Sequence, residues 1–262
     1  MSRKYKAVIA YDGTSYSGWQ RQENAVAVQQ VVEEVFSSID GSRVTVFGSS
    51  RTDSGVHAKG FVAHFWLTKP IPPKNFVRAA NARLPDAIRL LRASYASDDF
   101  DARISAKGKE YRYQLYQADI MPPHLAPYWT FCHRPLDVEA MRKAASFFVG
   151  RHDFAPFAAN PNRELETTVR TIFSFDILKS GCRYTFLVRG DGFLYKQVRS
   201  MVGFLISVGK GNEKPEAVKE ILDARTPRTA RVETAPGRGL FLWKVFYGSV
   251  PGAVAKKGGR RR

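Results

Sequence analysis

Residues 44–67 read VTVFGSSRTDSGVHAKGFVAHFWL, and their pattern is the most informative in the chain about its structure. Val44 and Val46 alternate with polar residues, and a second alternation of apolar residues runs from Phe61 to Leu67. Alternation with a period of two is the pattern of a β-strand with one buried face. Between the two patterns lies a run of small and polar residues around Asp53. We therefore expect two strands joined by a loop that carries Asp53.

The pattern around this stretch predicts one α+β unit in residues 1–105. Apolar residues recur at helical spacing from Val28 to Ile39, and Gly41 can end that helix. A proline-rich turn introduces the next helix. The expected order is β-α-β-β-α-β, with strands at 4–11, around 44–46, at 61–67 and at 87–93, and helices at 28–39 and 74–83.

The same order recurs in residues 106–248, so we expect two ferredoxin-like halves of an α+β protein. Such halves have mainly antiparallel sheets with helices on one side, like RNA-recognition modules, and an RNA cleft would lie between them. Residues 249–262 are expected to form a flexible basic tail. The second half should contain strands at 110–116, 172–178, 184–188 and 240–247, helices at 138–149 and 194–208, and an extra helix at 215–223.

The charge of the chain indicates a polyanionic partner. The formal net charge is +17, and only five of the basic residues belong to the tail after Pro251. The excess therefore belongs to the folded body, and nucleic acid is the natural partner of such a surface. No apolar run reaches the length of a membrane span, and no secretory leader precedes the first strand. With only Cys132 and Cys182, we expect reduced, buried thiols in a cytoplasmic protein.

Asp53 is the candidate reactive group, because it is the only acidic residue between Asp40 and Asp86. The small residues beside it would let the backbone approach a ligand closely. Arg51 supplies a fork of hydrogen-bond donors two positions away. A carboxylate in a basic cleft would repel phosphate, so a role in chemistry explains its presence better than a role in RNA affinity.

Two residues far away in the sequence could complete this site. Tyr111 and Tyr113 share one strand face beside basic residues and could stack on an unpaired base, or they could simply pack the sheet. Arg199 lies on an apolar helix and needs a carboxylate partner or an exit to solvent. Asp53 would be a suitable partner for Arg199.

Other chemistries find no support in the sequence. The five histidines form no HExxH or paired-cysteine pattern, so a metal site is not expected and each histidine is read as structural or RNA-facing. The segment Gly209 to Gly211 lacks the glycine and the hydroxyl residue of a P-loop. No GxSxG motif is present for a serine hydrolase.

The motif RTDSGVHA at residues 51–58 resembles the active-site motif of the tRNA pseudouridine synthases of the TruA type. Further segments resemble the same family in the same order along residues 4–248: YDGT at 11–14, GWQRQ at 18–22, FDARISA at 100–106, YRY at 111–113, HDF at 152–154, GFL at 192–194, VR at 198–199, AP at 235–236 and GLFL at 239–242.

The resemblance implies isomerisation of uridine to pseudouridine at positions 38, 39 and 40 of the tRNA anticodon stem-loop. It also implies a homodimer that works without a metal or a small-molecule cofactor. Asp53 would be the catalytic carboxylate, Tyr111 would pack against the target base and accept the proton from C5, and Arg199 would pair with Asp53. Arg51 would contact RNA, and Leu240 or Leu242 would wall the pocket.

Two alternatives remain open from the sequence. A noncatalytic RNA-binding protein would explain the charge and the tyrosines, although it leaves the acid in the cleft unexplained. A base-releasing glycosylase shares base extrusion and an acid but leaves an abasic product. Within the family reaction, residue identities do not decide whether Asp53 attacks the sugar carbon or removes a sugar proton to give a glycal.

Overall fold

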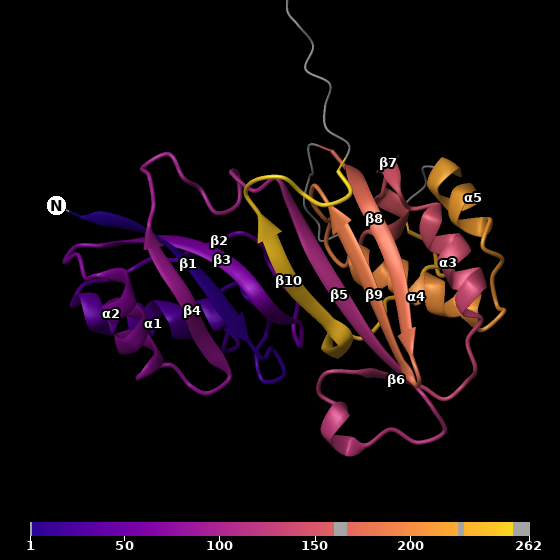
Figure 1. The fold of residues 1–262 in the computed structure, drawn as a ribbon, viewed down its shortest axis with the longest axis horizontal. Coiled ribbons are helices and arrows are strands. Elements are labelled where there is room, and N and C mark those ends of the chain that lie inside the picture. Colours follow the sequence, from indigo (N-terminus) through magenta and orange to yellow (C-terminus); the bar gives the residue numbers. More distant parts are fainter. Residues whose placement is uncertain (1, 160–166, 225–227, 254–262) are drawn as a thin grey trace, which may run out of the picture.

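The computed structural model describes residues 2–159, 167–224 and 228–253, in which ten strands form one continuous sheet (Figure 1). The strand order is β4-β1-β3-β10-β5-β9-β8-β7, with β2 paired to β3 and β6 paired to β5. The strands are β1 Arg3–Tyr11, β2 Phe47–Gly48, β3 His57–Leu67, β4 Ile88–Tyr95, β5 Gly108–Gln117, β6 Thr130–Cys132, β7 Gly150–Asp153, β8 Val169–Ser180, β9 Arg183–Gly190 and β10 Leu240–Phe246.

Five α-helices and three short 3-10 helices connect the described strands. The α-helices are α1 Val28–Asp40, α2 Pro73–Asn81, α3 Val138–Ser146, α4 Gln197–Gly209 and α5 Ala217–Ala224. Gly41, with φ 75°, ends α1, as its position predicts. The Asp137 side chain caps α3 by accepting a hydrogen bond of 2.9 Å from the Ala140 amide. The 3-10 helices are η1 Pro123–Leu125, η2 Ala155–Phe157 and η3 Gly237–Gly239.

Two parts of the sheet repeat one local order. In the N-terminal part the neighbours are β4-β1-β3-β2, and every pair is antiparallel. In the C-terminal part β10-β5-β9-β8 are likewise antiparallel neighbours. The two parts meet where β10 runs parallel to β3 at Phe241–His57 and Leu242–Ala58. The middle of the sheet therefore places the start of β3, directly after the Asp53 loop, beside β10, and β5 lies on the other side of β10.

The helices cover one face of the sheet. Figure 1 shows α1 and α2 behind the N-terminal strands and α4 behind β8 and β9. Phe36 of α1 and Phe76 of α2 pack on Phe65 of β3, with ring centroids 4.7 and 5.4 Å away. In the C-terminal part Phe204 of α4 packs edge-on against Phe157. Burial of these rings helps to stabilise the packing of the helices on the sheet.

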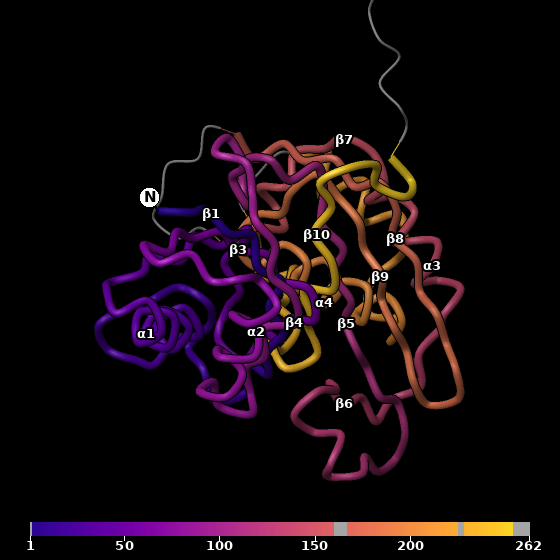
Figure 2. Tube along the Cα trace, turned by 60° about the vertical axis from the view of Figure 1, so that its left-hand side comes forward, coloured from indigo at the N-terminus to yellow at the C-terminus, as the bar shows by residue number. Residues whose placement is uncertain are grey.

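A long excursion leaves the sheet between β5 and β6. This segment, residues 118–129 with η1, extends beyond the lower end of the strands in both views (Figures 1 and 2). The C-terminal end of this segment is held close to the end of β1, because the Tyr128 hydroxyl donates a 2.7 Å hydrogen bond to Asp12. The expected elements did not include η1, β6 or β7, which are short and lack a periodic pattern.

Several expected boundaries were wrong. Val44 and Val46 are buried but lie outside a strand, and β2 is only Phe47–Gly48. Glu33 of α1 accepts the Val46 amide proton at 3.0 Å, and this bond replaces a strand ladder. The helix expected from Leu194 begins only at Gln197, since Lys196 has a left-handed φ of 58°. Strand β3 begins four residues earlier than expected, at His57.

Neither Cys132 nor Cys182 forms a disulfide within the described residues. Cys132 is buried, but Cys182 is exposed, so the expectation of two buried thiols was wrong for Cys182. Within the described ranges, no helix is long and apolar enough to cross a membrane. The basic end of the expected tail, residues 254–262, lies outside the described residues.

Candidate active site

The Asp53 loop is held by the glycine-rich loop that follows β1. The Trp19 amide donates to the Thr52 carbonyl at 3.1 Å, and the Gly55 amide donates to the Tyr16 carbonyl at 3.3 Å. Gly18 has φ 83°, and a Cβ at this position would lie 2.3 Å from the Thr52 carbonyl oxygen. Only glycine combines this backbone conformation with this close approach. Gly18 therefore allows the loop after β1 to pack closely against the Asp53 loop.

A buried hydrogen bond fixes the loop to the sheet. The Tyr11 hydroxyl lies 2.8 Å from Thr52 Oγ1, and both side chains are buried. Burial raises the pKa of the Tyr11 phenol well above its usual range, so this group remains a neutral hydrogen-bond partner. The loop is therefore fixed on the residue directly before Asp53.

Asp53 and Arg199 form an ion pair across 146 residues of sequence. Arg199 Nη1 lies 2.7 Å from Asp53 Oδ2, and the two side chains are only 15% and 16% exposed. Arg199 Nε also donates to the Ala235 carbonyl at 2.8 Å, which fixes the plane of the guanidinium. The predicted partner of Arg199 is confirmed as a contact, and the alternative in which Arg199 reaches past its helix to solvent is wrong.

Tyr111 lies beside this pair and is almost fully buried. Its ring meets Phe193 edge-on at 5.1 Å. Burial raises the pKa of Tyr111 to about 12; the Ser50 hydroxyl opposes this shift, and the charge of Asp53 adds to it. Strand β10 lies between Tyr111 and the start of β3: Leu242 is opposite Tyr111 on one side and pairs with Ala58, the last residue of the Asp53 motif, on the other.

Tyr113 does not join the site. Its hydroxyl lies 2.5 Å from Thr130 Oγ1 and donates to the Pro236 carbonyl at 2.9 Å, and its side chain is fully buried. The sequence left two possibilities for the tyrosines of β5: stacking on an unpaired base, or packing in the sheet. Tyr113 packs in the sheet.

The other residues expected at the site are Leu240 and Leu242, which lie on β10, and Arg51, which lies in the Asp53 loop. In the ladder between β10 and β5, Leu242 is opposite Tyr111 and Leu240 is opposite Tyr113. Residues directly opposite in an antiparallel pair share one side of the sheet. Arg51 is exposed two residues before Asp53.

His57 organises three loops around the site, a role that the sequence did not suggest. The Gly13 amide donates to Nδ1 at 3.0 Å, and Nε2 lies 3.1 Å from the carbonyl oxygens of both Pro127 and Arg238. Nε2 therefore carries the proton. Burial lowers the pKa of His57, although Asp12 at 3.1 Å acts in the opposite direction. In the sequence, this role of His57 is indicated only by its position in the motif RTDSGVHA, four residues after Asp53.

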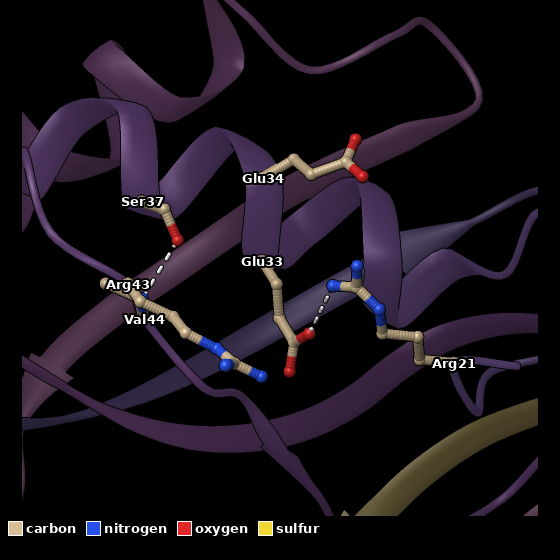
Figure 3. Close-up of a pocket in the computed structure, with 6 residues that line it drawn as sticks. All are labelled: Arg21, Glu33, Glu34, Ser37, Arg43 and Val44. Atoms are coloured by element: carbon tan, nitrogen blue, oxygen red, sulfur yellow. Dashed lines mark hydrogen bonds and ion pairs between the residues drawn. The ribbon is translucent and has the colours of Figure 1, made fainter. Parts of the chain in front are cut away.

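A pocket beside α1 is separate from these residues (Figure 3). It is lined by Arg21, Glu33, Glu34, Ser37, Arg43 and Val44. Glu33 lies 3.3 Å from Arg21 and also accepts the Val46 amide, so this acid connects α1 to the following segment. Across the described residues, no group of three or more His, Cys, Asp or Glu side chains is placed to hold a metal ion.

The chain is thus an α+β protein whose sheet brings a carboxylate–guanidinium pair close to a buried tyrosine. A family model described as tRNA pseudouridine synthase matches residues 7–104 and 144–248. The matched segments contain Asp53 and Arg199, and Tyr111 lies between them. The chain belongs to the tRNA pseudouridine synthase family.

Individual relatives agree with this assignment. The chain is 42% identical to tRNA pseudouridine synthase A 2 of Clostridium perfringens (strain 13 / Type A), over 94% of this chain and 100% of the relative. It is 43% identical to tRNA pseudouridine synthase A of Syntrophotalea carbinolica, over 92% of this chain and 95% of the relative. Among solved structures, it is similar to a chain of the archaeal box H/ACA sRNP Nop10-Cbf5 complex, with 13% identity, a TM-score of 0.36, and coverage of 77% of this chain and 44% of that chain.

Proposed function

We propose that this protein converts uridine to pseudouridine at positions 38, 39 and 40 of the tRNA anticodon stem-loop, with Asp53 as the catalytic carboxylate. The observation that carries the proposal is the Asp53–Arg199 pair of 2.7 Å beside Tyr111. The family membership supplies the reaction class. The net charge of +17 suits a tRNA substrate.

The reaction needs a precisely held acid and a closed pocket. The bond between ribose C1′ and uracil N1 breaks, the base rotates, and a bond from C1′ to C5 forms. The proton on C5 leaves and N1 gains one, so the composition of the RNA is unchanged. Asp53 can act on the sugar by attack at C1′ or by removal of a sugar proton, and its fixed position supports either step.

The proposed roles of the neighbouring residues follow from their positions. Tyr111 packs against the extruded uracil and removes the proton from C5, a step for which its phenol, whose pKa burial raises to about 12, must first lose its own proton. Leu242 walls the pocket, because it lies directly opposite Tyr111 in the strand ladder. Arg199 orients Asp53, and the exposed Arg51 contacts the RNA and helps hold the nucleotide out of its stack.

The larger architecture is part of the proposal. The repeated antiparallel order supports two ferredoxin-like halves, residues 1–105 and 106–248, followed by a basic tail at 249–262. Asp53 and Arg199 come from different halves, so the RNA cleft would lie between them. We further propose a homodimer that acts in the cytoplasm without a metal or a small-molecule cofactor.

The direct test uses tRNA labelled with tritium at uridine C5. The wild type should release tritium and leave the mass of unlabelled tRNA unchanged, whereas Asp53→Asn should bind tRNA and release none. Retained binding shows that the variant is folded. An abasic product would replace the proposal by a glycosylase, and tight binding without release from any tRNA would replace it by a noncatalytic RNA-binding protein.

A further inference from the structure

The Asp53 loop contains a buried hydroxyl group that has no hydrogen-bond partner. Ser50 is half-buried, but its Oγ is shielded from solvent, and no donor or acceptor among the described residues bonds to it. Buried polar atoms are nearly always paired, because an unpaired one loses its bonds to water and gains none in return. An unpaired hydroxyl beside a reacting group is therefore a candidate for a bond that forms only during the reaction.

The strand ladders place the Asp53 loop between two tyrosines. Tyr11 of β1 pairs with Ala58 of β3, which also pairs with Leu242 of β10. Leu242 pairs in turn with Tyr111 of β5. Paired residues share one side of the sheet, so these side chains form one row across four strands. At roughly 4.8 Å per strand, the Cα atoms of the two tyrosines are about 14 Å apart, and the loop joins the sheet between them.

Each of these tyrosines lies near a hydroxyl of the loop, but only one of the two hydrogen bonds is formed. The Tyr11 hydroxyl lies 2.8 Å from Thr52 Oγ1. The Ser50 hydroxyl is near enough to the Tyr111 phenol to act against the effect of burial on its pKa, although the two hydroxyls are not in the geometry of a hydrogen bond. The bond to Thr52 therefore fixes the loop, whereas the Ser50 hydroxyl remains available to Tyr111.

Ionisation of Tyr111 changes what the Ser50 hydroxyl can do. A phenolate oxygen only accepts hydrogen bonds, and a serine hydroxyl can rotate to donate one. A hydrogen bond to a charged oxygen is shorter and roughly twice as strong as a bond between neutral groups. A bond from Ser50 would therefore favour the ionised form of Tyr111 over the neutral form.

We propose that Ser50 is a positioning residue of the active site, whose hydroxyl donates a hydrogen bond to the Tyr111 oxygen when that phenol is ionised to accept the C5 proton. This inference rests on the proposed function, in which Tyr111 removes that proton. Once the phenolate has taken the proton, the phenol is neutral again and the bond weakens. Ser50 itself neither gains nor loses a proton.

The first measurement tests the hydrogen bond and needs no RNA. A fluorinated tyrosine at position 111 is a stronger acid than tyrosine, and fluorine NMR follows its ionisation in the folded protein. Ser50→Ala should raise the pKa of this phenol by about one unit, since loss of a hydrogen bond to the charged oxygen corresponds to roughly a tenfold change in ionisation. The other charged or titratable groups around the phenol, Asp53, Arg199 and Tyr11, are the same in both proteins.

The second measurement connects this bond to the reaction. In single turnovers with the natural Tyr111, Ser50→Ala should release tritium about 3- to 10-fold more slowly at unchanged tRNA affinity, because the ionised fraction falls and the stronger base recovers only part of the loss. The matched control is Ser174→Ala on β8, which also removes a buried hydroxyl without a partner and should keep the wild-type rate. Neither substitution breaks a formed hydrogen bond, so neither should lower the free energy of unfolding.

The proposal is overturned if the fluorinated tyrosine has the same pKa with Ser50 and with Ser50→Ala, or if its pKa changes and the rate of tritium release does not. Equal losses of release in Ser50→Ala and Ser174→Ala would overturn it as well. If the wild type releases no tritium from any tRNA, the proposed reaction is rejected, while the titration still decides whether Ser50 bonds to the Tyr111 phenolate.

Discussion

At the scale of single residues, Arg199 makes two hydrogen bonds that a lysine ammonium could not make in the same geometry. Its Nη1 meets Asp53, while its Nε binds the Ala235 carbonyl. A guanidinium can make both bonds in one plane, whereas an ammonium is a single point of charge. The direction of the Asp53 carboxylate therefore depends on the segment that carries Ala235.

Replacing Arg199 by lysine should preserve the positive charge but lose the fixed orientation of the Asp53 carboxylate. We expect Arg199→Lys to lower kcat by about 10- to 100-fold with little change in tRNA affinity, because the lost contact acts on the reacting carboxylate. Single-turnover tritium release measures the effect. Arg112→Lys, which changes an arginine paired with Glu110 on the opposite face, is the matched control and should stay near the wild-type rate. Equal losses in both variants would contradict the role of Arg199.

The contribution of the Tyr111 hydroxyl can be separated from that of its ring. Tyr111→Phe keeps the edge-on contact with Phe193 and removes only the hydroxyl. If this hydroxyl takes the C5 proton, tritium release should fall at least about 100-fold while tRNA binding is retained. Tyr113→Phe removes a hydroxyl that bonds Thr130 and Pro236, so it should instead lower the free energy of unfolding by about 1 kcal/mol. Normal release from Tyr111→Phe would assign the proton transfer to another group.

At the scale of elements, the position of Asp53 is set by a loop that is not continuous with it. The segment after β1 supplies Gly18, whose backbone touches Thr52, and Tyr16, whose carbonyl binds Gly55. The loop after β1 therefore holds the Asp53 loop in place. We expect substitutions in the loop after β1 to affect the proposed reaction through the position of Asp53.

Two glycines allow this coupling to be measured. Gly18 and Gly55 have similar positive φ values of 83° and 72°, so alanine imposes similar backbone strain of about 1 to 3 kcal/mol at each. At Gly18 the new methyl group would also collide with the Thr52 carbonyl, whereas at Gly55 nothing lies within 4 Å. Gly18→Ala should therefore reduce tritium release much more than Gly55→Ala, measured under conditions in which both variants are folded. Urea unfolding monitors the stability, and equal rates in the two variants would refute the coupling.

At the scale of the whole molecule, two buried histidines connect stability to pH. Burial lowers the pKa of His57 and of His64, although Asp12 and Asp101 oppose the shift. The unfolded chain then binds protons near pH 6.5 that the folded protein does not yet accept. The free energy of unfolding should consequently be highest above pH 6.5 and decrease as the pH falls through that value.

Urea denaturation at pH 7.5 and 5.5 tests this expectation. The wild type should be less stable at pH 5.5, and His57→Gln should lose part of that difference. His124→Gln changes an exposed histidine in η1 and should keep the full difference. If stability does not change over this range, protonation of the two buried histidines is not linked to folding. If it increases on acidification, the sign of the linkage is wrong.

The number of residues that separates two interacting groups in the sequence explains which features could be predicted. Helix α1, strand β5 and the cap of α3 follow from local periodicity and capping, so their positions were close to expectation. Strand β2 was misplaced because Glu33, a residue of α1, takes the amide of Val46. The start of α4 was misplaced because Lys196 adopts a left-handed conformation that its side chain does not signal.

The amino-acid sequence was enough to predict the α+β class, the basic character of the surface and the Asp53 motif, since these depend on composition, local periodicity and a contiguous run of residues. The folded structure was needed to show that Arg199 reaches Asp53, that Tyr113 packs in the core, and that His57 joins three loops. Strand neighbours such as β10 and β5 lie more than a hundred residues apart in sequence, and local preferences carry no information about such contacts. Their geometry arises only when burial of the whole sheet selects one register.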